Sequence, residues 1–192
     1  MALSVAVIYG SVRTNRQGTR VAHYLVNQLE ARGHEVDFID AKDENLPMLD
    51  KKYQDYADGE APANMVELQQ RLERADAYVV VTGEYNHSIQ PGLKNLLDYF
   101  MREYFFKPAG IASYSPGMIG GQRAAVHLRA ILSELHMVTI PTMFSVPQMS
   151  QALDDNGQPQ DRGLDKKVVR FLDELEWFGE ALKEARKRGE PY

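Results

Sequence analysis

Strand-like and helix-like segments alternate along the whole chain, and this alternation restricts the possible folds more than any other feature of the sequence. Apolar runs rich in β-branched residues predict five strands, at 3–9, 35–40, 77–82, 110–114 and 137–140. Apolar residues at helical spacing predict helices that follow these strands, at 18–32, 65–75, 91–104, 124–135 and 168–182. Such an alternation favours a parallel sheet with helices packed on both faces.

The first, third and fourth predicted strands are almost continuously apolar, which is typical of strands that are covered on both faces. We therefore expect a three-layer, doubly wound α/β fold, in which ligands bind beyond the carboxyl ends of the strands. That rule places three loops on one rim of the sheet: 10–18, 83–91 and 115–121.

The first rim loop has the composition of an anion site. It leads into a helix whose free backbone N–H groups and dipole favour a phosphate. Ser11 and Thr19 can donate hydrogen bonds, and Arg13 and Arg16 can donate charge-assisted ones. The loop lacks both the Walker A pattern and the three-glycine dinucleotide pattern, so a monophosphate such as that of FMN fits better. An ordinary strand-to-helix loop with solvated arginines is the alternative.

The second and third rim loops supply what a flat heteroaromatic ring needs. Loop 83–91 contains Tyr85, which can lie beside a ring face, and backbone groups that can bind its polar edge. Gly117, Gly120 and Gly121 of the third loop let the backbone approach a ligand closely. Each loop alone has the normal composition of a turn, but three such loops on one rim favour a bound mononucleotide.

Composition argues against several classes of function. The length of 192 residues suits one domain, and a formal net charge of -5 argues against wide nucleic-acid binding. The absence of cysteine excludes disulfides and thiolate chemistry, and the histidines have no metal-ligand spacing, so we predict no metal site. No signal peptide or membrane-length apolar run is visible, so we expect a cytoplasmic protein that spans no membrane.

The rim loops contain three longer motifs. They are Gly10-Ser11-Val12-Arg13, then Glu84-Tyr85-Asn86-His87-Ser88 with Pro91-Gly92-Leu93-Lys94-Asn95, and Ser115-Pro116-Gly117-Met118-Ile119-Gly120-Gly121. These motifs resemble the NAD(P)H-dependent FMN reductase family of flavodoxin-like proteins, which includes quinone, azo-dye and chromate reductases. The resemblance covers nearly the whole chain and implies one flavodoxin-like FMN-binding domain, 1–192, with a five-stranded parallel sheet in the order 2-1-3-4-5. One difference is that Gly83 stands where the family usually has proline.

The resemblance also implies which residues hold the cofactor. Those implied around the FMN phosphate are Ser11, Arg13, Gln17, Gly18 and Thr19, and those implied around the flavin ring are Glu84, Tyr85, Asn86, His87, Ser115, Gly117, Gly120 and Gly121. For His87, an exposed loop histidine with no contact to the ligand is the simpler interpretation.

The activity that the resemblance implies is reduction of flavin, quinone or similar small acceptors by NADPH or NADH through bound FMN. Donor and acceptor would use one pocket in turn, which gives ping-pong kinetics. No catalytic side chain is expected, because the flavin carries the chemistry. Two alternatives stay open: a flavodoxin-like electron carrier, and a flavin-binding regulator without turnover.

The third predicted helix and its exit are apolar on all sides. They contain Tyr99, Phe100, Met101, Tyr104, Phe105 and Phe106. Such a segment is either buried in its own domain or part of a subunit interface, where aromatic residues and methionine are enriched. The family resemblance implies dimers or dimers of dimers, so we expect a homodimer or homotetramer that uses this segment.

Overall fold

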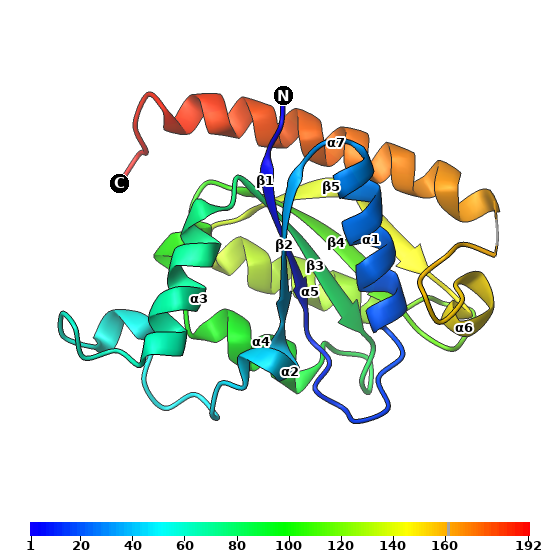
Figure 1. Ribbon diagram of the computed structural model, residues 1–192, viewed down its shortest axis with the longest axis horizontal. Helices are drawn as coiled ribbons and strands as arrows, with labels where there is room; N and C mark the ends of the chain where they lie inside the picture. Colours follow the sequence, from blue (N-terminus) through cyan, green and yellow to red (C-terminus); the bar gives the residue numbers. More distant parts are fainter. Residues whose placement is uncertain (161) are drawn as a thin grey trace.

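The computed structural model of the protein describes residues 1–160 and 162–192, and a five-stranded sheet forms its centre (Figure 1). The strand order is β2-β1-β3-β4-β5, and all neighbouring strands are parallel. The strands are β1 (Ser4–Tyr9), β2 (Glu35–Asp40), β3 (Ala77–Gly83), β4 (Pro108–Tyr114) and β5 (Val138–Val146). The predicted α/β fold and the order 2-1-3-4-5 are confirmed.

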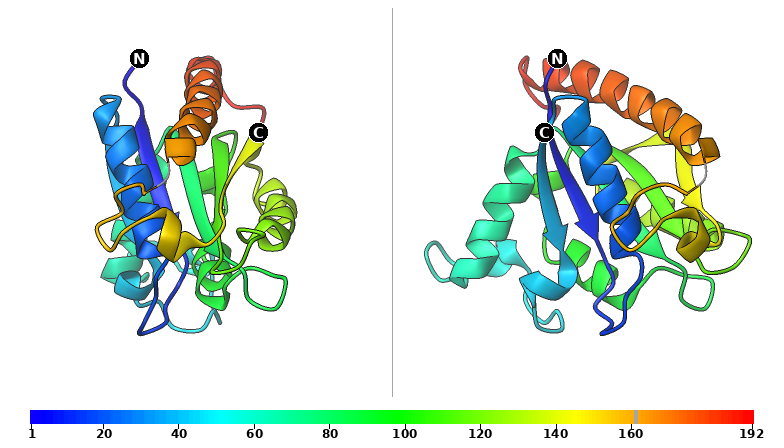
Figure 2. Two further views of the ribbon diagram at one scale, coloured as in Figure 1. Left: turned by 90° about the vertical axis from the view of Figure 1, so that its right-hand side faces the viewer. Right: turned by 45° about the vertical axis from the view of Figure 1, so that its right-hand side comes forward.

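Helices cover both faces of this sheet (Figure 2). They are α1 (Thr19–Ala31), α2 (Ala41–Glu44), α3 (Ala63–Arg74), α4 (Pro91–Asp98), α5 (Gln122–Glu134), α6 (Met149–Ala152) and α7 (Arg162–Arg186), with the 3-10 turns η1 (Tyr53–Asp55) and η2 (Arg102–Tyr104). In β1, Val7 and Tyr9 belong to the core under α1 and α7, whereas Ile8 belongs to the core under α3, α4 and α5. A strand that supplies two cores is apolar throughout, which explains the continuous apolar runs in the sequence.

The fifth strand is longer than predicted. β5 runs from Val138 through Pro141 to Val146, whereas the sequence favoured an end at 140. Proline is tolerated there because β5 is an edge strand, in which one side of the backbone needs no ladder hydrogen bond. The pairing also shifts register between Ala109 and Ile111 of β4, so an irregularity in the ladder accommodates the proline.

The helix predicted at 91–104 is shorter than expected. α4 ends at Asp98, and the backbone is no longer helical at Met101, where φ is -149° and ψ is -60°. A tertiary contact competes with the helix here, because the Tyr99 carbonyl accepts a hydrogen bond from the Tyr53 N–H at 2.9 Å. The prediction that residues 99–104 continue the helix was wrong.

The aromatic residues of this segment belong to the core of their own chain. Tyr99, Phe100 and Tyr104 are almost fully buried and belong to the same core as the buried residues of α3, α4 and α5. Phe105 and Phe106 are partly buried. The apolar character of the segment is therefore explained within one chain, and it no longer argues for a subunit interface.

The short helices α2 and α6 and the two 3-10 turns were not predicted. Each has four residues or fewer, which is too short for a periodic apolar pattern. α6 has consequences for the site, because it follows β5 directly and brings Met149 and Ser150 to the rim at the carboxyl ends of the strands.

Candidate functional site

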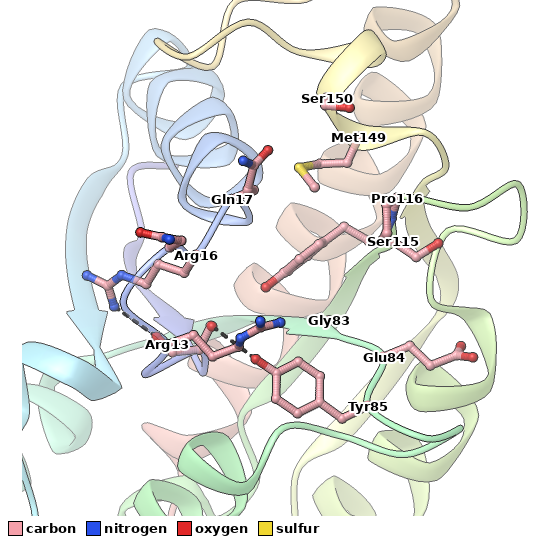
Figure 3. A pocket seen from close by; sticks show the side chains of 13 residues that line it. Arg13, Arg16, Gln17, Gly83, Glu84, Tyr85, Ser115, Pro116, Met149 and Ser150 are labelled. Atoms are coloured by element: carbon pink, nitrogen blue, oxygen red, sulfur yellow. Dashed lines mark hydrogen bonds between the residues drawn. The ribbon is translucent and has the colours of Figure 1, made fainter.

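A cavity of about 280 Å³ lies at the carboxyl ends of β1, β3 and β4 (Figure 3). Its walls come from the three predicted rim loops, and α6 closes a further side. The lining residues are Ser11, Arg13, Asn15, Arg16, Gln17, Gly83, Glu84, Tyr85, Tyr114, Ser115, Pro116, Met149 and Ser150. This is the position at which doubly wound sheets bind their ligands.

The positive end of the α1 helix dipole, at the first turn of the helix, has no acidic or capping side chain beside it among the described residues. In the described part of the chain, the N–H groups of Gly18 and Thr19 donate to no other group. The same turn has no acidic residue and no side-chain cap. An anion placed there would satisfy free N–H groups and would interact favourably with the helix dipole.

Arg13 is the free cation of the first rim loop. Its side chain is exposed and forms no ion pair with any residue that the structure describes. The guanidinium lies over the Tyr85 ring, with its carbon 6.0 Å from the ring centroid, and Figure 3 shows the two side chains at the same edge of the cavity. Arg13 is therefore available for charge-assisted hydrogen bonds to a phosphate.

Arg16 has partners within the protein. Its Nη1 donates to the carboxylate of Asp40 and, at 2.9 Å, to the carbonyl of Ser11. Asp40 ends β2 and is only 4% exposed, so its charge needs a nearby cation. The charge of Arg16 is balanced by this pair, and Arg13 is left as the uncompensated arginine of the loop.

The second rim loop forms a tight turn at the cavity edge. Tyr85 and Ser88 exchange two backbone hydrogen bonds of 2.9 Å, and Asn86 and His87 between them have φ values of 48° and 67°. Left-handed conformations cost energy in residues other than glycine, and such strain is concentrated at binding sites. The turn fixes Tyr85, whose hydroxyl lies 3.5 Å from Ser11 Oγ of the first loop.

Glu84 anchors this loop to a helix. Its carboxylate accepts hydrogen bonds from the Arg123 N–H at 3.1 Å and from Arg123 Nη1 at 3.3 Å. Arg123 is in the first turn of α5, so the carboxylate satisfies a free N–H group and compensates the helix dipole. In Figure 3 the carboxylate of Glu84 points away from Arg13.

Glycines determine the shape of the third rim loop. Gly120 and Gly121 have φ values of 65° and 77°, and a Cβ at Gly121 would lie 2.7 Å from the Tyr114 carbonyl oxygen. The Gly120 carbonyl accepts a hydrogen bond of 2.8 Å from Ser113 Oγ in β4. These glycines allow the loop to turn back closely against β4, and they do not line the cavity themselves.

The structure brings the three predicted loops together, but not every residue named for them reaches the cavity. Ser11, Arg13, Gln17, Glu84, Tyr85 and Ser115 line it. The residues that lie in the same loops without lining the cavity are Gly18, Thr19, Asn86, His87, Gly117, Gly120 and Gly121.

Two parts of the lining were missed by the sequence analysis. Tyr114 is the last residue of β4, so the rule that ligands bind at the carboxyl ends of strands could have identified it. Met149 and Ser150 follow β5, whose end was placed too early, and no rim loop was therefore expected there.

Two buried tyrosines, Tyr114 at the cavity floor and Tyr9 next to it, keep their protons. Burial raises the pKa of Tyr114 above its ordinary value, and the neighbouring Tyr9 raises it further. Burial likewise raises the pKa of Tyr9, although hydrogen bonds from neighbouring groups oppose the shift. Both hydroxyls can donate hydrogen bonds at neutral pH, and neither is suited to act as a base or nucleophile.

Residues 1–160 and 162–192 contain neither a metal centre nor a membrane-spanning helix. In these ranges no cluster of three or more histidine and acidic side chains could hold a metal ion. No helix within the same ranges is long and apolar enough to cross a membrane.

The cavity residues fit FMN. The free start of α1 and the uncompensated Arg13 suit a phosphate monoester. Tyr85 stands at the same cavity, on a turn whose backbone is fixed, and suits contact with a flat ring. FMN combines one phosphate with one such ring.

The sequence and the fold match known proteins. A family model described as NADPH-dependent FMN reductase matches residues 3–151. A 2-hydroxy-1,4-benzoquinone reductase from Burkholderia sp is 32% identical over 180 residues, which are 90% of this chain and 94% of the relative. An FMN-dependent NADPH-azoreductase from Staphylococcus aureus is 28% identical over 152 residues, or 79% of this chain and 80% of the relative. The solved structure of FerB, a flavoenzyme NAD(P)H:(acceptor) oxidoreductase from Paracoccus denitrificans, has a TM-score of 0.72 at 25% identity and covers 95% of this chain and 98% of its own.

The matched region includes the rim motifs on which the family resemblance is based. The matched residues 3–151 contain all three rim loops, so the family model includes the whole predicted site region. The expected family, the oxidoreductase class and the use of FMN with NADPH are confirmed by these matches. The chain belongs to the NADPH-dependent FMN reductase family.

Proposed function

We propose that this protein holds FMN in the rim cavity and catalyses ping-pong reduction of quinones or related small aromatic acceptors by NADPH, with NADH as the second candidate donor. One observation carries the proposal: Arg13 and Tyr85 line the same cavity, and the uncompensated start of α1 directly follows Gln17, which also lines it. The names of two relatives, a benzoquinone reductase and an azoreductase, support aromatic acceptors.

The first rim loop would hold the phosphate of FMN. Arg13 and the N–H groups of Gly18 and Thr19 are donors without partners in the described chain. Ser11 and Gln17 line the same part of the cavity and add side-chain donors.

The second and third loops would hold the flavin ring. Tyr85 would lie beside the ring, and the strained backbone of Asn86 and His87 would be held ready for its polar edge. Glu84 would act indirectly, because its carboxylate is bonded to Arg123. Of the third-loop residues assigned to the ring, Ser115 lines the cavity, and Gly117, Gly120 and Gly121 would act by shaping the loop.

Bound FMN would supply hydride acceptance and donation, and the chain would supply binding and orientation. The cavity is partly open to solvent, so donor and acceptor can enter it in turn. Protons for the reduced acceptor would come from water, because the buried hydroxyls of Tyr9 and Tyr114 retain theirs.

The deciding experiment is steady-state oxidation of NADPH by the FMN-loaded protein with a soluble benzoquinone as acceptor. We expect sustained turnover and parallel double-reciprocal plots, which indicate ping-pong kinetics. Bound FMN without sustained turnover would instead favour the electron carrier or the flavin-binding regulator. Intersecting plots would contradict the use of one pocket in turn.

The remaining assignments concern the whole chain. We propose that residues 1–192 form a single FMN-binding domain, that the protein is cytoplasmic and that it forms a homodimer or homotetramer. The oligomer rests on the family resemblance alone, since the aromatic residues after α4 pack in their own core. Light scattering that gives the mass of a monomer at micromolar concentration would overturn it.

A further inference from the structure

Tyr114 connects all three rim loops beneath the cavity. It ends β4 and leads into the third loop, and its side chain is 7% exposed at the cavity floor. Its hydroxyl accepts a hydrogen bond of 2.9 Å from Gln90 Nε2, at the end of the second loop, and donates one of 3.4 Å to the hydroxyl of Tyr9. Tyr9 directly precedes the first loop.

Two glycines make room for this side chain. A Cβ at Gly18, which precedes α1, would lie 2.0 Å from Tyr114 Cζ and 2.2 Å from its hydroxyl. A Cβ at Gly83, which ends β3, would lie 2.9 Å from the same Cζ and 3.0 Å from Gln90 Nε2. The Tyr114 ring therefore occupies the space that a side chain on either loop would need.

Gln90 depends on Tyr114 for its side-chain hydrogen bond. Gln90 is 1% exposed, and its Oε1 has no partner in the described part of the chain. Its Nε2 donates to the Tyr114 hydroxyl. Loss of that hydroxyl would leave both ends of a buried amide unsatisfied at the start of α4.

The contacts of Tyr114 extend to the residues that line the cavity. The Ser11 side chain is near enough to the Tyr9 hydroxyl to lower the pKa of Tyr9, and Ser11 Oγ lies 3.5 Å from the Tyr85 hydroxyl. Neighbouring hydroxyl groups thus extend from the buried floor to the edges of the first and second loops.

We propose that Tyr114 is a positioning residue that sets the spacing between the first and second rim loops, with Gly18 and Gly83 as the sockets for its ring. Its hydroxyl, which is hydrogen-bonded to Gln90 and Tyr9, acts on the ligand through those loops. The inference that this spacing serves FMN rests on the proposed function, whereas the contact between Tyr114 and its two glycines does not.

A double-mutant cycle on the apoprotein tests whether the Tyr114 ring fills the space beside Gly83. We expect Gly83→Ala to lower the urea midpoint in the wild-type background, because the new Cβ meets the Tyr114 ring. The same substitution should cost much less in a Tyr114→Leu background, whose shorter side chain vacates the socket. If Gly83→Ala lowered the urea midpoint equally in the two backgrounds, the proposed packing of Tyr114 against Gly83 would be wrong, whether or not FMN binds.

Titration with FMN tests the positioning role. Tyr114→Phe removes only a hydroxyl. We expect the dissociation constant for FMN to rise about tenfold and the visible spectrum of the bound flavin to change. Tyr78→Phe is the matched control, because it also removes a buried hydroxyl, which donates to the carbonyls of Leu72 and Glu103 at 2.6 and 2.8 Å. Tyr78 lies near the start of β3, away from the cavity.

The control should lose stability and keep the affinity and spectrum of the wild type. An equal loss of affinity in the two variants, or no loss in Tyr114→Phe, would overturn the positioning role. Failure of the wild-type protein to bind FMN would overturn the proposed function instead, and the double-mutant cycle would still decide whether Tyr114 spaces the loops.

Discussion

The two ends of the sheet differ in how their charged groups are satisfied. At the amino end, the protein supplies the partners. Asp76 accepts hydrogen bonds from the Ser4 N–H at 3.0 Å and from Lys183 Nζ at 2.6 Å. Lys107 is almost fully buried, and its ammonium group donates to two carbonyl groups at the end of α3.

At the carboxyl end, several groups lack partners within the described chain. Arg13 has no carboxylate beside it, and the N–H groups of Gly18 and Thr19 donate to nothing. Asn86 and His87 hold left-handed backbone conformations in the adjoining turn. These features add nothing to the stability of the fold, and they suit a bound anion and ring.

The comparison separates groups that maintain the fold from groups that await a ligand. A buried charge with a partner becomes costly when that partner is removed, because a charge is then left unpaired. An exposed charge without a partner adds little to folding. Removal of a paired charge at the amino end should therefore change stability, and removal of the unpaired charge of Arg13 at the carboxyl end should change binding.

The largest effect is expected at Asp76. Asp76→Ala should lower the free energy of unfolding by about 3 kcal/mol, because it leaves Lys183 and Arg186 without their carboxylate. Chemical denaturation measures this change. Asp155→Ala is the control, because that carboxylate is 85% exposed and its pairing with Arg20 should contribute less than about 1 kcal/mol. If folded Asp76→Ala instead lost affinity for FMN, the claim that this carboxylate serves stability and not binding would be contradicted.

Arg13→Ala should have the complementary effect. We expect it to weaken FMN binding about ten- to a hundredfold, which corresponds to about 1.5–3 kcal/mol for a charge-assisted hydrogen bond. The melting temperature of the apoprotein should stay the same. Arg188→Ala changes the net charge equally at the other end of the molecule and controls for long-range attraction. An unchanged dissociation constant in Arg13→Ala would place the phosphate elsewhere.

A smaller effect is expected at Lys107, whose contribution to the free energy of unfolding should depend on pH. Burial, together with the charge of the nearby Arg186, lowers its pKa from 10.5 to about 8. Between these values the unfolded chain binds more protons than the folded one, so the stability of the wild type should rise with pH from 8 towards 10. Relative to Lys107→Met, the gain should be on the order of 1 kcal/mol, measured by urea denaturation at several pH values. A difference between the two proteins that does not change with pH would contradict this account.

The smallest effect is expected at His87. Its side chain is exposed and does not line the cavity, so His87→Ala should leave the rates of flavin reduction and reoxidation nearly unchanged. A positioned general acid contributes about 10²–10⁴-fold. Stopped-flow measurements with NADPH and a quinone distinguish the two cases, and a loss of that size on reoxidation would identify His87 as a proton donor.

Much of the fold could be predicted from local patterns. β1, β3 and β4 supply both cores, and their continuous apolar runs made a parallel sheet the best interpretation. The end of α4 could not be predicted in this way, because a hydrogen bond from Tyr53 to the Tyr99 carbonyl competes with the helix. The second half of β5 could not be predicted because Pro141 argues against a continued strand. A proline is tolerated within β5 because β5 lies at the edge of the sheet.

The candidate site was predictable at the level of loops and less so at the level of side chains. The rule for carboxyl ends brought Arg13 and Tyr85 to one cavity. No local pattern indicates that Arg16 is balanced by Asp40, which is distant in the sequence. Similarly, no local pattern indicates that Gly83 lies against the Tyr114 ring.

The central claim is that the unpartnered groups at the carboxyl end hold the phosphate of a flavin mononucleotide. The most direct measurement is an equilibrium titration of the apoprotein with FMN and, in parallel, with riboflavin, which lacks the phosphate. We expect FMN to bind at least about tenfold more tightly than riboflavin, because only FMN can engage Arg13 and the start of α1. Equal affinity for the two flavins, or no binding of either, would contradict the account.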